Sequence, residues 1–167
     1  LDVNNNPHNP GIGVRSFSES AEDVARHGVA YIQGYQEAGN IATVKHFPGH
    51  GDTETDSHHA LPVIPHDLER LEKLEFLPFR KAIRAGVDCV MSAHISFPAL
   101  ETDKNRPATL SYSVITGLLR ETMGFSGVVM TDCLEMNAIS KTVGTAEGAL
   151  QALKAGIDIP LISHTYS

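Results

Sequence analysis

The sequence predicts an α/β fold in which helices cover both faces of a parallel sheet. Segments that are apolar almost throughout alternate with segments of helical periodicity, a pattern typical of buried parallel strands and their crossover helices. A helix end, a glycine turn and a strand start recur as one pattern at residues 82–88 and 152–158. Polar residues follow the carboxyl ends of four predicted strands, the edge where parallel α/β folds bind ligands. They are His46, His94, Asp132 and His164.

The first predicted helix lies between Ser20 and Gly39. Ser20 with Asp23 three positions later resembles a capping box, apolar residues then recur at helical spacing, and Gly39 provides a C-terminal stop. A short strand over residues 41–46 follows. After a polar loop, Asp67 begins the next helical run.

Pro78 divides that second helical run, and we expect it to lie in the first turn of a restarted helix that ends at Gly86. Residues 87–93 then form a buried strand. Ser111 caps the third helix, which Gly124 closes.

The last two strands are expected at residues 127–131 and 157–163, with a helix over residues 145–155 between them. Pro160 lies inside the final strand and cannot donate a ladder hydrogen bond. We therefore expect this strand to be an edge or to be locally bulged.

Composition excludes several classes of protein. At 167 residues with 41% hydrophobic residues, the chain is expected to form one domain with a sizeable core. A net charge of -7 and a pI near 5.6 disfavour a nucleic-acid partner. No apolar run approaches the ~20 residues of a membrane span. Cys89 and Cys133 are expected to be unlinked buried residues.

Residues 45–59 form the most unusual segment of the chain. They contain four of the nine histidines together with three carboxylates. Pro48, Gly49 and Gly51 interrupt the segment, so it is expected to form an irregular loop, and loops on rigid scaffolds often carry chemistry.

This segment and several others resemble the β-N-acetylglucosaminidase branch of glycoside hydrolase family 3. The resemblance extends over nearly the whole chain in the order of the family's motifs. The matching stretches are residues 2–7, 11–17, 45–62, 91–94, 107–111 and 127–136.

The resemblance implies a (β/α)8 barrel of the TIM type, of which this chain would supply about four parallel βα units, from the fourth strand to the seventh. A complete barrel typically needs ~250 residues. We therefore expect residues 1–167 to be a single fragment of the catalytic barrel domain. An uncovered sheet edge would favour self-association of such a fragment.

The activity implied by the resemblance is that of a retaining exo-β-N-acetylglucosaminidase (β-N-acetylhexosaminidase). The parent protein would release terminal N-acetylglucosamine from peptidoglycan or chitin fragments, so its partner would be an oligosaccharide or muropeptide containing this sugar. The resemblance implies no cofactor and no metal. It favours an exported or cell-wall-associated parent over a cytoplasmic one, and we expect the isolated fragment to be inactive.

Three residues match the catalytic groups of the family. Asp132 corresponds to the nucleophile that forms a covalent glycosyl ester, although a helix N-cap is the structural alternative. Asp56 and His58 correspond to an Asp-His pair in which His58 shuttles the proton and Asp56 orients the imidazole. An imidazole titrating near ~6.5 can both donate and accept a proton at neutral pH. A loop histidine bonded to the backbone is the alternative for His58.

Arg15, Lys45 and His46 match sugar-binding residues of the family, and charged donors suit the hydroxyl and amide oxygens of an N-acetylated sugar. A surface arginine is the alternative for Arg15, and a structural role is the alternative for one of Lys45 and His46. His94 is expected either to line the floor of the site or to be a satisfied core histidine. We assign His66 to solvent.

Two other functions are compatible with the same residues. One is a metal-dependent hydrolase, because His46, His50, Asp52, Asp56 and His58 all have ligand chemistry. Proline and glycine between His46 and His50 argue against the helical ligand pair that this function would use. The other is a fragment that binds sugar without catalysis.

Overall fold

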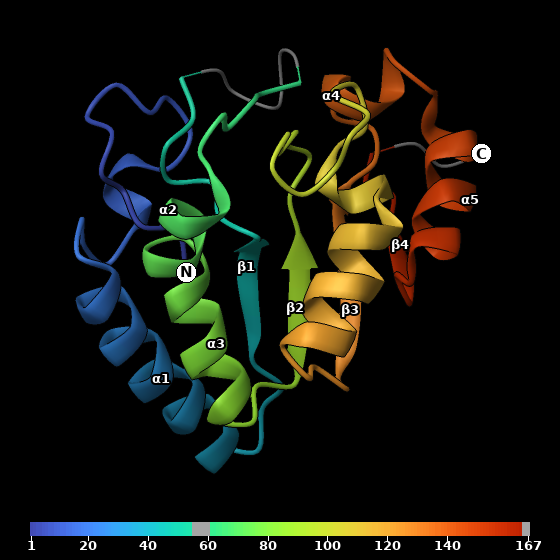
Figure 1. Ribbon diagram of the computed structural model, residues 1–167. Helices are drawn as coiled ribbons and strands as arrows, with labels where there is room; N and C mark the ends of the chain where they lie inside the picture. Colours follow the sequence, from blue (N-terminus) through green and yellow to red (C-terminus); the bar gives the residue numbers. More distant parts are fainter. Residues whose placement is uncertain (55–60, 165–167) are drawn as a thin grey trace.

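The computed structural model describes residues 1–54 and 61–164. Its four strands form one parallel sheet in the sequential order β1-β2-β3-β4, and all point toward the loops at the top of Figure 1. The strands are β1 (Thr43–Phe47), β2 (Cys89–Ser92), β3 (Val128–Cys133) and β4 (Ile159–Leu161). Parallel neighbours in sequential order are what consecutive βα units of a barrel require.

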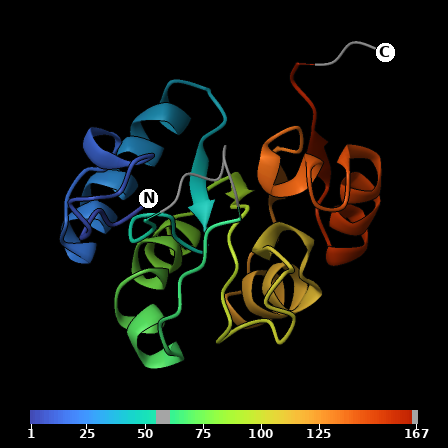
Figure 2. The same cartoon turned by 90° about the horizontal axis from the view of Figure 1, so that it is seen from above.

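Helices lie on one side of the sheet. Seen from above, they form an arc outside the strands (Figure 2). They are α1 (Ala21–Glu37), α2 (Leu68–Lys73), α3 (Phe76–Arg84), η3 (Ser113–Thr122), α4 (Asn137–Ser140) and α5 (Thr145–Ala155), with the short 3-10 turns η1 (Gly13–Arg15) and η2 (Ala108–Leu110).

The expectation that both faces of the sheet are covered is wrong for the described chain. Val44, Val90 and Val129 are buried against the helices, whereas Lys45 and Val128, on the other face, are exposed. This alternation is that of a barrel wall, where one face meets the helices and the other faces the barrel interior.

Two of the predicted helix starts are confirmed by their caps. Ser20 Oγ accepts a hydrogen bond from the Asp23 amide at the start of α1, and Asp67 Oδ1 accepts one from the Arg70 amide at 2.8 Å at the start of α2. Pro78 lies in the first turn of α3, as expected. The helix η3 has π-type hydrogen bonding, which the sequence did not predict.

The repeated sequence pattern performs the same structural task twice. Asp88 Oδ2 accepts the Ala42 amide at 2.9 Å, and Asp158 Oδ2 accepts the Val129 amide at 2.7 Å. Each aspartate lies one residue before a strand and accepts a backbone amide from the start of the preceding strand or the residue just before it, which ties β1 to β2 and β3 to β4.

Irregular register occurs in the sheet beside two predicted site residues. From Val44 to Phe47, β1 advances three residues while β2 advances two, from Val90 to Ser92. The extra residue makes a β-bulge at the position of Lys45 and His46. Bulges redirect side chains near active sites.

A second register shift lies between Met130 and Cys133, opposite Pro160 of β4. The expectation that the strand with Pro160 is an edge is confirmed for the described sheet, whereas the extra residue at the register shift lies in β3 and not in β4. The Leu161 amide donates to Thr131 Oγ1 at 2.8 Å. β3 extends two residues beyond its predicted end, so Asp132 lies inside the strand.

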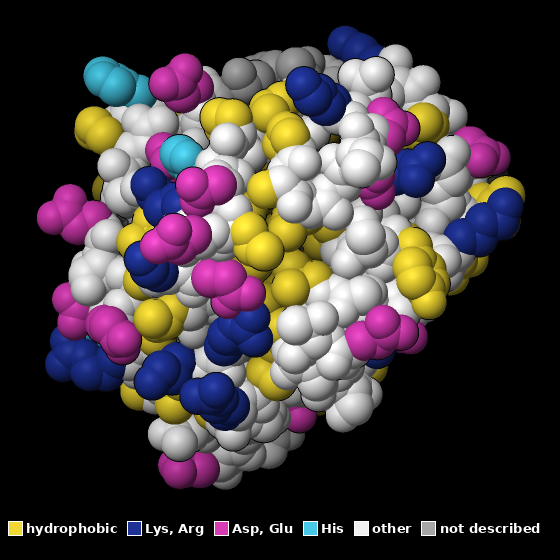
Figure 3. All heavy atoms as spheres, viewed as in Figure 1, with side chains coloured by type: hydrophobic (Ala, Val, Ile, Leu, Met, Phe, Trp, Pro, Cys, Tyr) yellow, Lys and Arg dark blue, Asp and Glu magenta, His cyan; other side chains and the backbone are white. Residues whose placement is uncertain are grey.

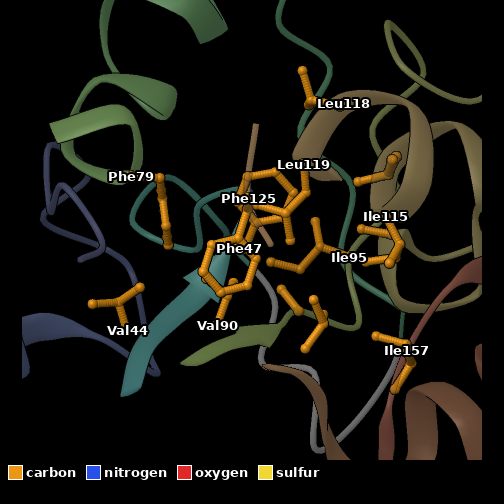
Figure 4. Packing of buried hydrophobic residues seen from close by; sticks show 14 of the residues in the cluster. Val44, Phe47, Phe79, Val90, Ile95, Ile115, Leu118, Leu119, Phe125 and Ile157 are labelled. Carbon is orange, nitrogen blue, oxygen red and sulfur yellow. The ribbon is translucent and has the colours of Figure 1, made fainter. Parts of the chain in front are cut away.

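One continuous core joins the sheet to its helices. Phe47 and Phe79 meet edge to face with ring centroids 5.3 Å apart, and Val90 and Ile115 are fully buried between strand and helix (Figure 4). Burying a side chain of this size contributes about 1.5–3 kcal/mol. Cys89 and the other cysteine are both buried and unlinked, as predicted.

Charged side chains of both signs are interspersed over α2 and α3 on the face shown in Figure 3. Arg80 and Glu72 form a two-pronged ion pair there, with the shortest contact 2.7 Å. Within the described part of the chain, every helix is too short or too polar to cross a bilayer.

Candidate active site

Asp132 lies one residue before the end of β3, and its carboxylate is partly open to solvent, with 24% of the side chain exposed. Its Oδ1 atom accepts the Cys133 amide at 2.8 Å, which fixes one edge of the carboxylate. The second oxygen, Oδ2, is directed toward His46 of β1, with 3.7 Å between Oδ2 and Nε2. The bulges in β1 and beside β4 bring these two side chains to the same side of the sheet edge.

His46 is held from behind by Asp2. The ring atom Nδ1 lies 2.7 Å from Asp2 Oδ2, and both side chains are only 6% exposed. A carboxylate can only accept a hydrogen bond, so Nδ1 carries the proton and Nε2 faces Asp132. The three side chains form a continuous chain of contacts, Asp2 to His46 to Asp132.

Asp2 is a residue that the sequence analysis missed. Its Oδ1 also accepts the backbone amides of His46 at 3.1 Å and His50 at 2.8 Å. Burial raises the pKa of the Asp2 carboxyl, whereas the charge and hydrogen bond of the His46 ring lower this pKa. No local pattern marks Asp2, because its partners lie more than forty positions away in sequence.

His50 and Thr53 hold the loop that follows β1. His50 Nδ1 lies 2.9 Å from Thr53 Oγ1, and the imidazoles of His46 and His50 meet edge to face at 5.4 Å. Asn9 reaches across from the first segment of the chain and donates to the His50 carbonyl at 2.8 Å. The loop is therefore attached to residues more than forty positions away in sequence.

A second set of contacts holds the loop on its other side, and it corrects the assignment of His66 to solvent. His66 Nε2 lies 2.6 Å from Asp52 Oδ2, and Arg70 Nη2 lies 3.3 Å from both this atom and Glu75 Oε1. Burial raises the pKa of Glu75, against the opposing charge of Arg70. The sequence alone does not predict this contact, because it depends on the path of the loop that carries Asp52 toward His66.

A small cavity of about 80 Å³ connects the predicted sugar-binding residues. Arg15, Lys45 and His46 all line it, together with Asp2 and Phe17. Arg15 lies on η1, where its Nη1 atom donates to the Gly11 carbonyl at 2.9 Å. Ligand pockets usually measure ~300–1,000 Å³, so this cavity would hold only part of a sugar.

His94 is a satisfied core histidine, the second of the two expectations for it. It is 1% exposed, with Nε2 3.0 Å from the Cys133 carbonyl and Nδ1 2.9 Å from Thr109 Oγ1. Burial lowers the pKa of His94, which favours the neutral ring. The contact of His94 with the Cys133 carbonyl supports the end of β3 next to Asp132.

The structure thus gathers Arg15, Lys45, His46 and Asp132 at one edge of the sheet. Asp56 and His58 lie outside the described residues.

Among residues 1–54 and 61–164, the ligands considered for a metal-dependent hydrolase, His46, His50 and Asp52, do not form one cluster. Asp52 groups with His66 and Glu75, apart from His46 and His50, whose Nδ1 atoms contact Asp2 and Thr53.

Residues 1–167 match the family model of the glycosyl hydrolase family 3 N-terminal domain. The chain belongs to this family. Beta-hexosaminidase A of Pseudoalteromonas piscicida is 42% identical over 172 residues, which cover 97% of this chain and 29% of that protein. The four-stranded sheet with its outer helices is accordingly the predicted part of a TIM-type barrel.

Solved family 3 structures are also similar to this chain. A β-N-acetylglucosaminidase from Paenibacillus sp. str. FPU-7 superposes with a TM-score of 0.97 at 63% identity and covers 99% of this chain and 31% of its own. NagZ from Neisseria gonorrhoeae, in complex with N-trifluoroacetyl-D-glucosamine, gives a TM-score of 0.80 at 39% identity, with 90% and 43% covered. The chain spans less than half the length of these relatives.

Proposed function

We propose that the protein to which this chain belongs is a retaining exo-β-N-acetylglucosaminidase that hydrolyses terminal N-acetylglucosamine from peptidoglycan or chitin fragments. The names of the family 3 relatives support the sugar and the bond. Two-step hydrolysis with retention needs a nucleophile below the sugar ring and a proton donor beside the leaving oxygen.

The observation that carries the proposal is the contact chain from Asp2 through His46 to Asp132 beside a cavity lined by Arg15 and Lys45. Asp132 is the nucleophile in this mechanism. Its partial exposure allows attack, and the hydrogen bond from the Cys133 amide fixes the carboxylate so that little reorganisation is needed on approach to the transition state.

His46, Lys45 and Arg15 bind the sugar. The proton on His46 Nδ1 is committed to Asp2, so a neutral ring can present its Nε2 atom only as an acceptor, and a sugar hydroxyl would be its donor. Lys45 and Arg15 supply charged donors to the hydroxyl and amide oxygens at the cavity wall.

His58 acts as general acid and then as general base, and Asp56 orients it. This part of the proposal rests on the family motif, since neither residue is among the described ones. Acid-base catalysis by such a group typically accounts for ~10²–10⁴-fold in rate.

The test is Asp132→Ala in the longer protein, with turnover of both a disaccharide and an aryl N-acetylglucosaminide measured. The proposal predicts loss of activity on both substrates, because no covalent ester can form whatever the leaving group. Asp158→Ala, which removes a carboxylate near the opposite end of the strands, is the control and should keep the ratio of the two activities unchanged. Substantial turnover by Asp132→Ala, or an inverted product, would contradict the proposal.

A further inference from the structure

Three buried polar side chains form a network between the ends of β2 and β3. Ser92 is the last residue of β2, His94 lies two residues beyond it, and Thr109 belongs to the turn η2. Ser92 and Thr109 are fully buried, and His94 is 1% exposed. Buried polar groups are costly unless their hydrogen bonds are made. The proposed mechanism uses none of the three side chains, and their role is therefore open.

The imidazole of His94 is the centre of the network. Thr109 Oγ1 lies 2.9 Å from Ser92 Oγ and 2.9 Å from His94 Nδ1. On the other side of the ring, Nε2 lies 3.0 Å from the carbonyl oxygen of Cys133. A carbonyl oxygen only accepts hydrogen bonds, so Nε2 carries a proton and is the donor.

The proton positions in the network follow from the neutral state of the ring. Burial lowers the pKa of His94 against the opposing charge of Asp132, which favours the neutral ring. With its single proton on Nε2, the ring presents Nδ1 as an acceptor to the Thr109 hydroxyl. The Ser92 hydroxyl then donates to Thr109 Oγ1. An imidazolium would instead turn the Thr109 proton toward the Ala93 carbonyl, 2.8 Å from Oγ1, and would bury a cation.

Cys133 is the residue through which this network reaches the nucleophile. Its amide donates to Asp132 Oδ1 at 2.8 Å, and its carbonyl accepts the hydrogen bond from His94 Nε2. The next residue, Leu134, donates its amide to the Leu161 carbonyl at 2.9 Å. His94 therefore anchors the chain after Asp132 on the β2 side, and Leu161 anchors it on the β4 side. The direction of the Cys133 amide, and with it that of the Asp132 carboxylate, depends on both anchors.

We propose that His94 is a positioning residue for the nucleophile. Through its Nε2–H group it holds Cys133 where the Cys133 amide orients the Asp132 carboxylate, while His94 itself neither contacts the sugar nor transfers a proton. The inference rests on the proposed role of Asp132. Rate depends steeply on the position of a reacting group, since a displacement of about 1 Å can cost ~10²-fold.

His94→Leu and His94→Gln in the longer protein test the proposal. Leucine removes the donor, and we expect kcat/KM to fall at least about tenfold, toward the ~10²-fold of a displaced reacting group. The loss should be the same on a disaccharide and on an activated aryl N-acetylglucosaminide, because Asp132 attacks in the first step whatever the leaving group. His94→Gln should recover much of the activity, since its amide nitrogen can donate to the Cys133 carbonyl.

Competitive inhibition by N-acetylglucosamine separates positioning from sugar binding. Its inhibition constant should be nearly unchanged in His94→Leu, because the proposed sugar-binding side chains are unaltered. Leu119→Ala, which removes buried volume from η3, is the control for stability. It should unfold more readily in urea and keep the kcat/KM of the unaltered protein.

Thr109 provides a second, independent pair of variants if His94→Leu fails to fold. Thr109→Val removes the hydroxyl that donates to Nδ1 and should lower kcat/KM, whereas Thr109→Ser keeps a hydroxyl and should not. In the double variant, Thr109→Val should add little to the loss from His94→Leu, because the hydroxyl acts through the ring.

Four results would overturn the proposal: an unchanged kcat/KM in His94→Leu, equal losses in His94→Leu and His94→Gln, an inhibition constant that rises as much as kcat/KM falls, or additive losses in the double variant. Each of them would leave Asp132 as the nucleophile if Asp132→Ala is inactive. Activity in Asp132→Ala would instead contradict the proposed function itself.

Discussion

Asp2 orders the candidate site through its contacts with His46 and with the loop after β1. It accepts hydrogen bonds from two backbone amides and one imidazole of the segment that includes His46 and His50. These donors lie on both sides of the sharp turn after β1, so one buried carboxylate fixes the direction of the loop as well as the plane of the His46 ring. A buried charge of this kind is tolerated because all its partners are present.

Asp2→Asn should therefore destabilise the chain by about 3–5 kcal/mol, the usual cost of breaking a buried charged pair. The amide nitrogen of asparagine would face the N–H groups of the loop, donor against donor. Urea unfolding monitored by circular dichroism measures the change. Asp23→Asn is the matched control, since the pair of Asp23 with Arg26 is solvent-exposed and such pairs contribute about 0–1 kcal/mol. Equal losses in the two variants would contradict the role of Asp2.

For single residues, the sequence predicts membership of the candidate site better than it predicts which side chains contact one another. Arg15, Lys45, His46 and Asp132 were predicted from motif and strand-end position, and the structure brings them together. The pairing of His66 with Asp52 depends on a loop path that no local pattern encodes.

Among the structural elements, the loop after β1 packs closely against the backbone of the first residues of the chain. A Cβ atom added to Gly51 would lie 1.8 Å from the Val3 carbonyl oxygen, whereas one added to Gly34 in α1 would meet nothing within 4 Å. Glycine at position 51 is thus required by the first segment of the chain packing directly on the loop.

Gly51→Ala and Gly34→Ala should consequently have opposite effects. The first must displace residues 1–3 or the loop, and we expect it to destabilise the chain by several kcal/mol, more than the ~1–3 kcal/mol of ordinary overpacking, because the obstacle is backbone. The second should stabilise the chain by up to about 1 kcal/mol, as alanine does inside a helix. Thermal unfolding of both variants provides the measurement, and a Gly51→Ala protein as stable as the parent chain would refute the packing argument.

The order and type of the main elements followed from periodicity and caps, because these are local properties. Element ends were less accurate. β3 continues through Asp132 because Thr131 and Cys133 contribute to pairing with β4, a tertiary effect. Of the two bulges, only the one opposite Pro160 had a signal in the sequence, the missing donor of proline.

At the scale of the whole 167-residue chain, β1 is an edge strand of the described sheet. A groove of about 400 Å³ runs beside it, lined by aromatic and aliphatic side chains including Tyr31, Tyr35 and Ile41. The rings of Tyr31 and Tyr35 stack at 5.0 Å, and both are exposed. An edge strand next to an apolar surface favours pairing with another chain.

We expect the 167-residue chain to self-associate in a concentration-dependent manner through this edge. Ile41→Lys places a charge beside β1 and should shift light scattering toward monomer. Val143→Lys, a comparable change near α5, should have little effect. A monodisperse monomer at high concentration for the unaltered chain would exclude the edge as a contact surface.

The proposed mechanism forms a covalent glycosyl ester on the carboxylate of Asp132, and this ester can be observed. In the longer protein, His58→Ala should react with an N-acetylglucosaminide bearing an acidic phenol, because that leaving group needs little protonation. The second step should be slow without its general base. Intact-protein mass spectrometry followed by peptide mapping should then show one N-acetylglucosamine residue esterified to Asp132. An unmodified protein during turnover, or a sugar attached to a different carboxylate, would contradict the assignment of Asp132 as the nucleophile.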